Sequence, residues 1–179
     1  MSAVNPQPTI AGLKCSHELC LLETTPDWAA TLPELLAELA RRRVNLPLVL
    51  DLPCKAAAGR VALCLEPAVA EEAWDLARRA AEAHGLGAPR LIRQVVLVQF
   101  FPLSQDLGLP AAALASLARA GLTPLGLATS LSAVVLVVRQ EHLAATLDIL
   151  ARDFDLPEGL SPPEARMAVV QSSRTREEV

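Results

Sequence analysis

The chain has 179 residues, of which 52% are hydrophobic and 3% aromatic, with no tyrosine. Its formal net charge of −4 at pH 7 gives no electrostatic reason to expect nucleic acid or an anionic membrane as a partner. The few aromatic side chains also leave little surface on which bases could stack. The length fits one large domain or two small ones, and the mean hydropathy of +0.34 predicts apolar surface shared between modules or subunits.

One uncharged stretch, residues 120–138, is long enough to span a bilayer as a helix. Gly121, Pro124 and Gly126 interrupt it, and its second half is rich in β-branched residues. This pattern favours two strands with a turn near residues 129–132. The first residues of the chain lack the basic and then apolar run of a signal peptide. We therefore expect a cytoplasmic protein with no membrane partner.

In chain order, the first half predicts two strands, a helix, two more strands and a second helix. The first helix carries a complete apolar stripe, formed by Leu32, Leu35, Leu36, Leu39 and Ala40. This spacing is that of one buried helical face. Thr31 and Glu34 have capping-box spacing at its start. The expected strands cover residues 9–14, 17–25, 46–52 and 60–66. The first expected helix begins near residues 27–31, and the second covers residues 69–84.

The second half predicts a strand, a helix, two strands and a helix. A loop centred on residues 105–108 precedes its first helix, and Gly121 stands where that helix should stop. Residues 133–138 are apolar and mostly β-branched, as in a strand covered on both sides or packed at an interface. An apolar stripe ending at Phe154 predicts the last helix. The remaining expectations are a strand over residues 91–101, an edge strand over 166–171 and disorder over 172–179.

The two halves of the sequence repeat one another. At a shift of 78 positions, residues of the two central helices match: Leu36, Leu39 and Arg41 fall on Leu114, Leu117 and Arg119. Farther along, the shift becomes 74 positions, and residues 55–59 absorb the difference. A period this regular predicts a duplication. The expected modules cover residues 9–85 and 90–157, with a linker too short for independent motion and a tail over 158–179.

Residues 117–154, LARAGLTPLGLATSLSAVVLVVRQEHLAATLDILARDF, resemble the ACT-domain regulatory region of aspartokinases. In that region a helix ends in an "aGIn" turn, a strand carries a "TSe"-type pair, and a valine-rich strand leads into a helix ending in "LhexF". The opening TIAGLKCSHELCLLE is similar to the "iTGIa" start of the same region. The resemblance extends over residues 9–157. It implies an α+β fold of two ferredoxin-like ACT modules, each an antiparallel four-stranded sheet with two helices on one face.

The resemblance also implies a mode of action. ACT modules pair edge to edge and bind an amino acid at the interface of the pair. The 179 residues contain no kinase portion, and in some bacteria aspartokinase has a small second subunit of about this content. The chain departs from the pattern at Leu131, where the family has glutamate, and at Thr123, where it has asparagine. The first copy keeps the asparagine as Asn45, but has Asp51-Leu52-Pro53 where the Thr-Ser pair is expected.

The better candidate ligand site lies in the second copy, and consists of Gln105, Asp106, Leu107, Gly108, Leu109, Thr123, Pro124, Leu125, Thr129 and Ser130. Backbone N–H groups at the helix N-terminus can bind a carboxylate, Asp106 can accept from an ammonium group, and Gly108 allows close backbone approach. The matching positions of the first copy are Asp27, Trp28, Ala29, Ala30 and Asn45. Simpler roles are open too: Asp106 caps its helix, Thr129 and Ser130 form a turn, and Trp28 packs at a module interface.

The sequence shows no catalytic or metal-binding motif. None of the three histidines has a serine or cysteine motif beside it, and the glycines form no phosphate-binding loop. The pairs Cys15-x4-Cys20 and Cys54-x9-Cys64 lack the paired two-residue spacing of zinc sites. We therefore expect no metal and no other cofactor.

We predict a non-catalytic regulatory protein that senses an aspartate-family amino acid, such as lysine, threonine or methionine, and modulates a partner enzyme such as aspartokinase. The retained Gly108 and the Thr129-Ser130 pair favour sensing. The alternative is a structural subunit that has lost ligand binding, which Leu131 favours. An enzyme is the third possibility, because sites assembled across a fold leave no local motif. We expect a homodimer, or a complex with an amino-acid biosynthetic enzyme, and no nucleic-acid partner.

Overall fold

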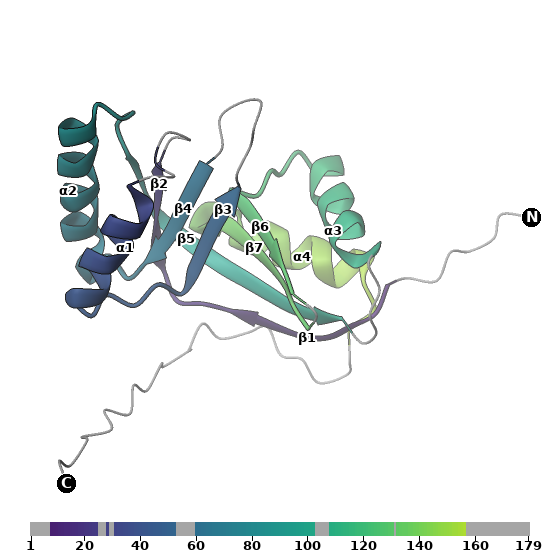
Figure 1. The fold of residues 1–179 in the computed structure, drawn as a ribbon. Helices are drawn as coiled ribbons and strands as arrows, with labels where there is room; N and C mark the ends of the chain where they lie inside the picture. Colours follow the sequence, from purple (N-terminus) through teal and green to yellow (C-terminus); the bar gives the residue numbers. More distant parts are fainter. Residues whose placement is uncertain are drawn as a thin grey trace, which may run out of the picture.

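The computed structural model describes residues 8–24, 28, 31–52, 60–102, 108–130 and 132–156. The strands are β1 (Ile10–Cys15), β2 (Leu19–Thr24), β3 (Leu48–Leu52), β4 (Arg60–Leu65), β5 (Arg90–Pro102), β6 (Gly126–Thr129) and β7 (Val134–Arg139). The helices are α1 (Leu32–Arg41), α2 (Pro67–His84), α3 (Gly108–Arg119), the short η2 (Gln140–His142) and α4 (Leu143–Asp153). The order strand, helix, strand, strand, helix thus occurs twice, from β2 to α2 and from β5 to α4 (Figure 1).

The strands form one antiparallel sheet in the order β3-β4-β2-β5-β7-β6, with β1 also pairing with β5. The long strand β5 joins the two ends of this path. Its first residues pair with β2, and its later residues pair with β1 along the same edge and with β7 along the other. We call β2, α1, β3, β4, α2 and the start of β5 the first half. The second half is β1, the end of β5, α3, β6, β7 and α4.

The strand β5 is irregular where it passes from one half to the other. Its pairing with β2 shifts register between Leu19 and Leu21, and Gln94 has a φ angle of 56°. An extra residue of this kind bends a strand and increases its local twist. The bend allows a single strand to serve two differently oriented sheet regions.

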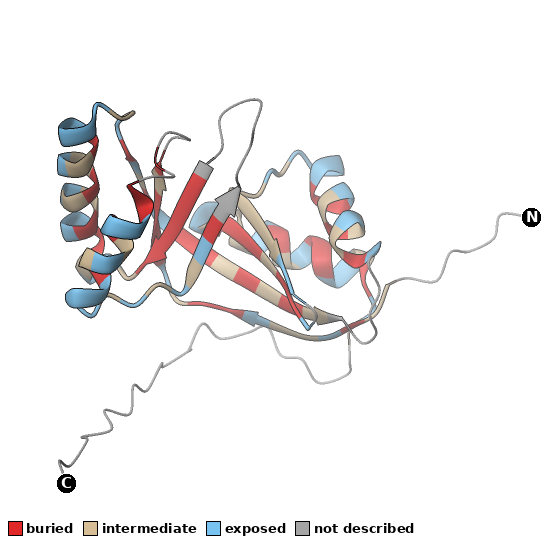
Figure 2. Ribbon diagram, viewed as in Figure 1, coloured by how far each residue is buried: buried red, intermediate tan, exposed pale blue. Residues whose placement is uncertain are grey.

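Each half has its own pair of helices on the outer face of its sheet region. Helices α1 and α2 cover the first half, and α3 and α4 cover the second (Figures 1 and 2). Ile10 and Cys15 pack in the core beneath α3 and α4, so β1 belongs in space to the second half although it lies in the sequence of the first copy. The valine-rich strand predicted from the sequence is β7, whose Leu136 and Val137 are both fully buried on opposite sides.

A third cluster of buried residues lies on the inner sheet faces, between the halves. It combines Leu19, Leu21, Leu50, Ala62, Cys64, Ile92, Val95 and Val137. The edge strands β3 and β6 approach each other closely there. A Cβ atom placed on Gly126 of β6 would lie 2.6 Å from Leu50 Cδ1 of β3. The molecule is therefore layered as helices, sheet region, sheet region and helices.

The helix ends explain part of the local structure. Gly121 has a φ angle of 74° and follows α3, as predicted, and Leu122 N–H donates to the Leu117 carbonyl. Arg43 occupies the same place after α1 with a φ angle of 57°. The capping box expected at Thr31 is absent: this residue has helical backbone angles, and its side chain forms no capping hydrogen bond. None of the described helices is long and apolar enough to cross a membrane.

Candidate functional site

The loop predicted to bind a ligand in the second copy lies partly outside the described residues, which exclude Gln105, Asp106 and Leu107. Gly108 is exposed and begins α3. Leu109 is 1% exposed and packs in the core of the second half. The side chain of Leu109 therefore has a structural role.

The other predicted residues of the second copy flank β6. Thr123 and Thr129 are exposed, and Pro124 is half-buried. Leu125 packs against the cluster between the halves, and its N–H donates to the Val137 carbonyl at 2.7 Å. The Ser130 hydroxyl oxygen accepts a hydrogen bond from Ala133 N–H at 3.1 Å. Ser130 thus forms a turn between β6 and β7, one of the roles that the sequence allowed.

Of the predicted residues in the first copy, Asp27, Ala29 and Ala30 lie outside the described part of the chain. Trp28 is 0% exposed, and its indole N–H donates to the Gly87 carbonyl at 3.3 Å. It packs in the core of the first half. Asn45 is exposed and follows α1, whereas Trp28 precedes it, so the structure does not bring these two residues together.

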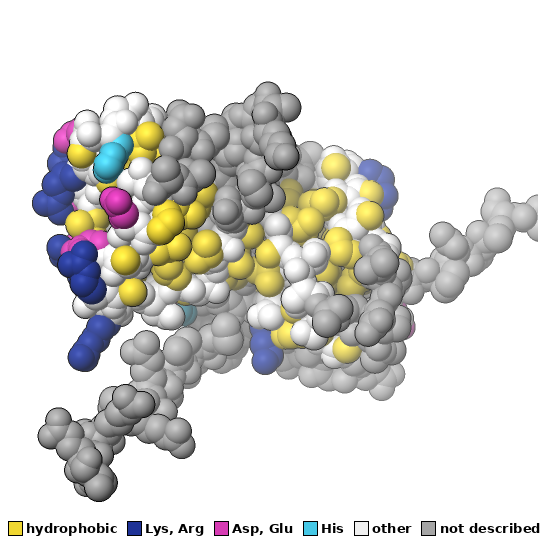
Figure 3. Space-filling model, in the orientation of Figure 1, with side chains coloured by type: hydrophobic (Ala, Val, Ile, Leu, Met, Phe, Trp, Pro, Cys, Tyr) yellow, Lys and Arg dark blue, Asp and Glu magenta, His cyan; other side chains and the backbone are white. Residues whose placement is uncertain are grey.

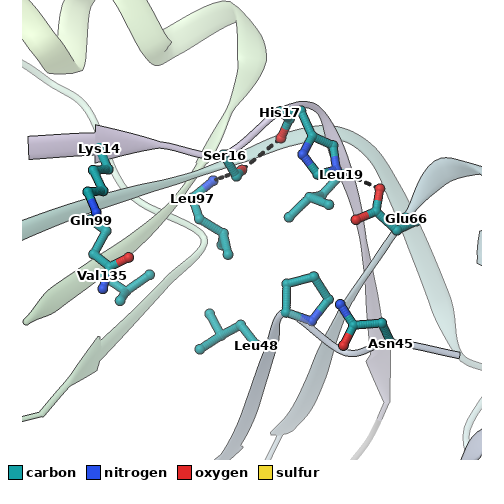
Figure 4. Close-up of a pocket in the computed structure, with 11 residues that line it drawn as sticks. Lys14, Ser16, His17, Leu19, Asn45, Leu48, Glu66, Leu97, Gln99 and Val135 are labelled. Atoms are coloured by element: carbon teal, nitrogen blue, oxygen red, sulfur yellow. Dashed lines mark hydrogen bonds and ion pairs between the residues drawn. The ribbon is translucent and has the colours of Figure 1, made fainter. Parts of the chain in front are cut away.

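A cavity of about 290 Å³ lies where the two halves meet (Figure 4). Among the predicted site residues that the structure describes, Asn45 alone lines it. The polar residues around it are Lys14, Ser16, His17, Asn45, Glu66 and Gln99. They come from the strand β1, the β1–β2 connection, the α1–β3 connection, the start of α2 and the strand β5, and most of these segments are far apart in the sequence. No local motif could have revealed this cavity.

Ser16 fixes the β1–β2 connection onto β5. Its backbone N–H donates to the Leu97 carbonyl at 2.9 Å, and its hydroxyl oxygen accepts from Leu97 N–H at 2.9 Å. The same hydroxyl donates to the His17 carbonyl at 2.7 Å. These bonds replace the strand ladder where β1 ends and β2 has not yet begun, and they place His17 beside the cavity.

His17 and Glu66 link the two walls of the cavity. The distance from His17 Nε2 to Glu66 Oε2 is 2.5 Å, and both side chains are about one-third exposed, at 38% and 33%. Glu66 immediately precedes α2 and has an extended backbone. The pair therefore ties the β1–β2 connection to the start of that helix.

Lys14 stands at another part of the wall. It lies opposite Gln99 in the ladder between β1 and β5, and its Nζ lies 5.5 Å from the centroid of the Phe101 ring. Within the described residues, Lys14 forms no ion pair with a carboxylate. Among the described residues that line the cavity, it is the one lysine or arginine.

The described residues contain no cluster of three or more possible metal ligands. Burial raises the pKa of the Cys15 thiol to about 11 and that of the Cys64 thiol to about 12. Both are therefore protonated at neutral pH and are poor nucleophiles. The cavity itself is lined by charged, polar and apolar side chains, which can bind the charged and apolar parts of a small molecule.

Comparison with known proteins identifies the fold. The chain has the α+β fold of aspartokinase regulatory regions, although no protein-family model and no curated protein sequence matches it. The regulatory subunit of aspartate kinase from Thermus flavus is 16% identical at a TM-score of 0.70, covering 82% of this chain and 99% of its own.

Two further solved structures agree with this fold. A structure of aspartokinase alpha and beta subunits is 12% identical with a TM-score of 0.70, and covers 81% of this chain and 98% of the matched chain. Escherichia coli aspartokinase III, solved in complex with lysine and aspartate, is 15% identical with a TM-score of 0.58. This match covers 86% of the present chain but only 35% of the longer enzyme. The chain therefore spans about a third of the length of that enzyme.

Proposed function

We propose that the chain is a non-catalytic regulatory subunit built from two ACT modules, with sequence boundaries at 9–85 and 90–157, and that it acts in the cytoplasm. In this proposal it binds lysine, threonine or methionine and modulates an enzyme such as aspartokinase. The single observation that carries the proposal is the match to regulatory subunits of aspartate kinase over 99% of their length. The lysine in the related aspartokinase III complex supports an amino-acid ligand.

The two ends of the sheet path support association with a second chain. The strands β3 and β6 end the described sheet path, and unpaired edges are where strands of another chain can add. Hydrophobic side chains gather across this part of the molecule (Figure 3), and Val49 of β3 is 43% exposed. We propose a homodimer or a complex with the regulated enzyme. Light scattering that shows a lone monomer of 19.0 kDa at micromolar concentration would contradict self-association.

The competing function is a structural subunit that holds its partner enzyme without sensing a ligand. The core position of Leu109 and the turn formed by Ser130 favour it, because both side chains have structural roles. A thermal-shift screen of the twenty amino acids separates the two functions. A ligand at a hundred times its dissociation constant adds about 2.7 kcal/mol of stability. No shift with any amino acid, together with binding to an aspartokinase catalytic subunit, would establish the structural alternative.

The second test is the substitution Asp106→Asn, with Asp148→Asn on the exposed face of α4 as a matched control. If Asp106 holds the ammonium group of the ligand, its neutral replacement should weaken binding at least tenfold, about 1.4 kcal/mol, and leave the fold intact. Calorimetric titration with the amino acid found in the screen measures this change. Equal affinity in both variants would move the ligand site away from this loop.

A further inference from the structure

The cavity between the halves has opposite charges at its two ends. Figure 4 shows Lys14 and Gln99 at one end, with Glu66 and Asn45 at the other. The first end is a regular cross-strand row, because Gln99 of β5 pairs with Lys14 on one side and with Val135 of β7 on the other. The second end is built by the first half. A molecule in this cavity would touch both halves.

Between these ends the wall of the cavity is apolar. Leu19, Leu48 and Leu97 line this middle part. Leu97 lies two residues before Gln99 on β5, a separation of about 7 Å along a strand. In Figure 4, Leu97 and its hydrogen bond to Ser16 lie between Gln99 and Glu66. An apolar stretch of wall thus lies between the two charged ends, and a hydrocarbon chain could contact it.

We propose that this cavity binds a linear ω-aminocarboxylate, with the carboxylate at Lys14 and the ammonium group at Glu66. The Gln99 amide can donate a second hydrogen bond to the carboxylate, and the Asn45 side-chain oxygen can accept from the ammonium group. Glu66 can serve His17 and the ligand together, because a carboxylate has two oxygens and about four acceptor positions. The volume of about 290 Å³ admits a small molecule of this size.

The charge separation distinguishes this ligand from a short α-amino acid. A short α-amino acid carries its only ammonium group and its carboxylate on one carbon atom, so it can reach only one end of the cavity with both. Lysine is the exception, because its ε-ammonium group is separated from its carboxylate as in 6-aminohexanoate. The site is also separate from the loops around Asp106 and Ser130, and the inference therefore goes beyond the proposed function. Its failure would leave the screen of amino acids and the Asp106→Asn test unaffected.

Titration calorimetry with 6-aminohexanoate tests the proposal on the full chain. Hexanoate and hexylamine each present one of the two charged ends, and we expect each to bind at least tenfold more weakly. The substitutions Lys14→Met and Glu66→Gln should each weaken 6-aminohexanoate at least tenfold. Their matched controls, Arg79→Met and Glu34→Gln, should not change its affinity. Glu34 is a suitable control because it also faces a histidine, with 3.9 Å between its Oε2 and His84 Nε2.

The variant Val135→Phe adds a ring to the cavity wall and tests the location without a change of charge. It should abolish binding of 6-aminohexanoate, and its circular dichroism spectrum should match that of the unmodified protein. Absence of saturable binding at millimolar concentrations would overturn the proposal. Equal affinities for 6-aminohexanoate and hexanoate, or unchanged affinity in both Lys14→Met and Glu66→Gln, would overturn it as well.

Discussion

The two tryptophans provide a matched test of how the first half is held together. Trp28 and Trp74 each donate one indole hydrogen bond of 3.3 Å to the connection between α2 and β5, at the carbonyls of Gly87 and Pro89 respectively. They differ in burial, because Trp28 is 0% exposed and Trp74 is only half-buried. The substitutions Trp28→Phe and Trp74→Phe remove the same atoms and the same kind of hydrogen bond. The difference between them therefore measures the effect of burial.

The expected magnitudes follow from these contacts. Loss of the hydrogen bond costs about 1 kcal/mol in either variant. Replacement of a buried tryptophan by alanine costs about 3–5 kcal/mol, and phenylalanine retains part of that packing, so Trp28→Phe should cost about 2–3 kcal/mol. Trp74→Phe should cost about 1 kcal/mol. For a chain of this length, Tm should fall by about 4–12 °C at Trp28 and about 2–4 °C at Trp74.

Urea unfolding followed by far-UV circular dichroism is the appropriate assay, because the substitutions alter tryptophan fluorescence itself. The free energies of unfolding are comparable if the slope with urea is the same in all three proteins. Equal losses of stability in the two variants would refute the reasoning from burial. A Trp28→Phe protein of unchanged stability that no longer binds an amino acid would instead place Trp28 against the ligand.

Three further experiments test the fold. Gly126→Val should destabilise the protein by about 1–3 kcal/mol in thermal unfolding, and Leu50→Ala in the same chain should cost less than in the unmodified protein, because the two side chains compete for one space. Arg43→Gly should raise the free energy of unfolding by about 0.5–1 kcal/mol, because φ is 57° there. Hydrogen bonds, first from Arg152, hold the pKa of Asp153 well below its usual range. Its contribution to stability is therefore present above pH about 4 and lost as the pH falls further, so acid titration of Asp153→Asn should show a smaller loss.

Local patterns predicted the elements well where the residue types of one short segment determine its structure. The β-branched run at residues 133–138 predicted β7, and Gly121 predicted the end of α3. The spacing of Thr31 and Glu34 failed to predict a capping box, because the backbone angles at Thr31 are helical and its side chain makes no capping bond. A sequence spacing is necessary for such a cap, but the approach angle of the chain decides whether it forms.

The arrangement of the halves was harder to predict from the sequence, because it depends on contacts between residues that are distant along the chain. Nothing local indicates that Ile10 packs beneath the second pair of helices, or that His17 meets Glu66 across 49 positions. Resemblance to aspartokinase regulatory regions directed attention to loops near Asp106 and Trp28. Of the residues in that set that the structure describes, the cavity includes Asn45 alone. Pairing between distant segments is decided by the fold as a whole, which a pattern of single residues does not contain.

The shared strand β5 has a consequence for any attempt to divide this protein at its repeat. A cut within residues 86–89 would leave the N-terminal fragment without the neighbour that covers β2, including the fully buried Leu21 and Leu22. The C-terminal fragment would keep β5 but lose β1 and its buried Ile10. Each fragment would expose an apolar strand edge that can pair with the other fragment. Mixed together, the two fragments should reassemble; alone, each should aggregate. The smallest unit that folds on its own is therefore the pair of halves, although the sequence consists of two similar copies.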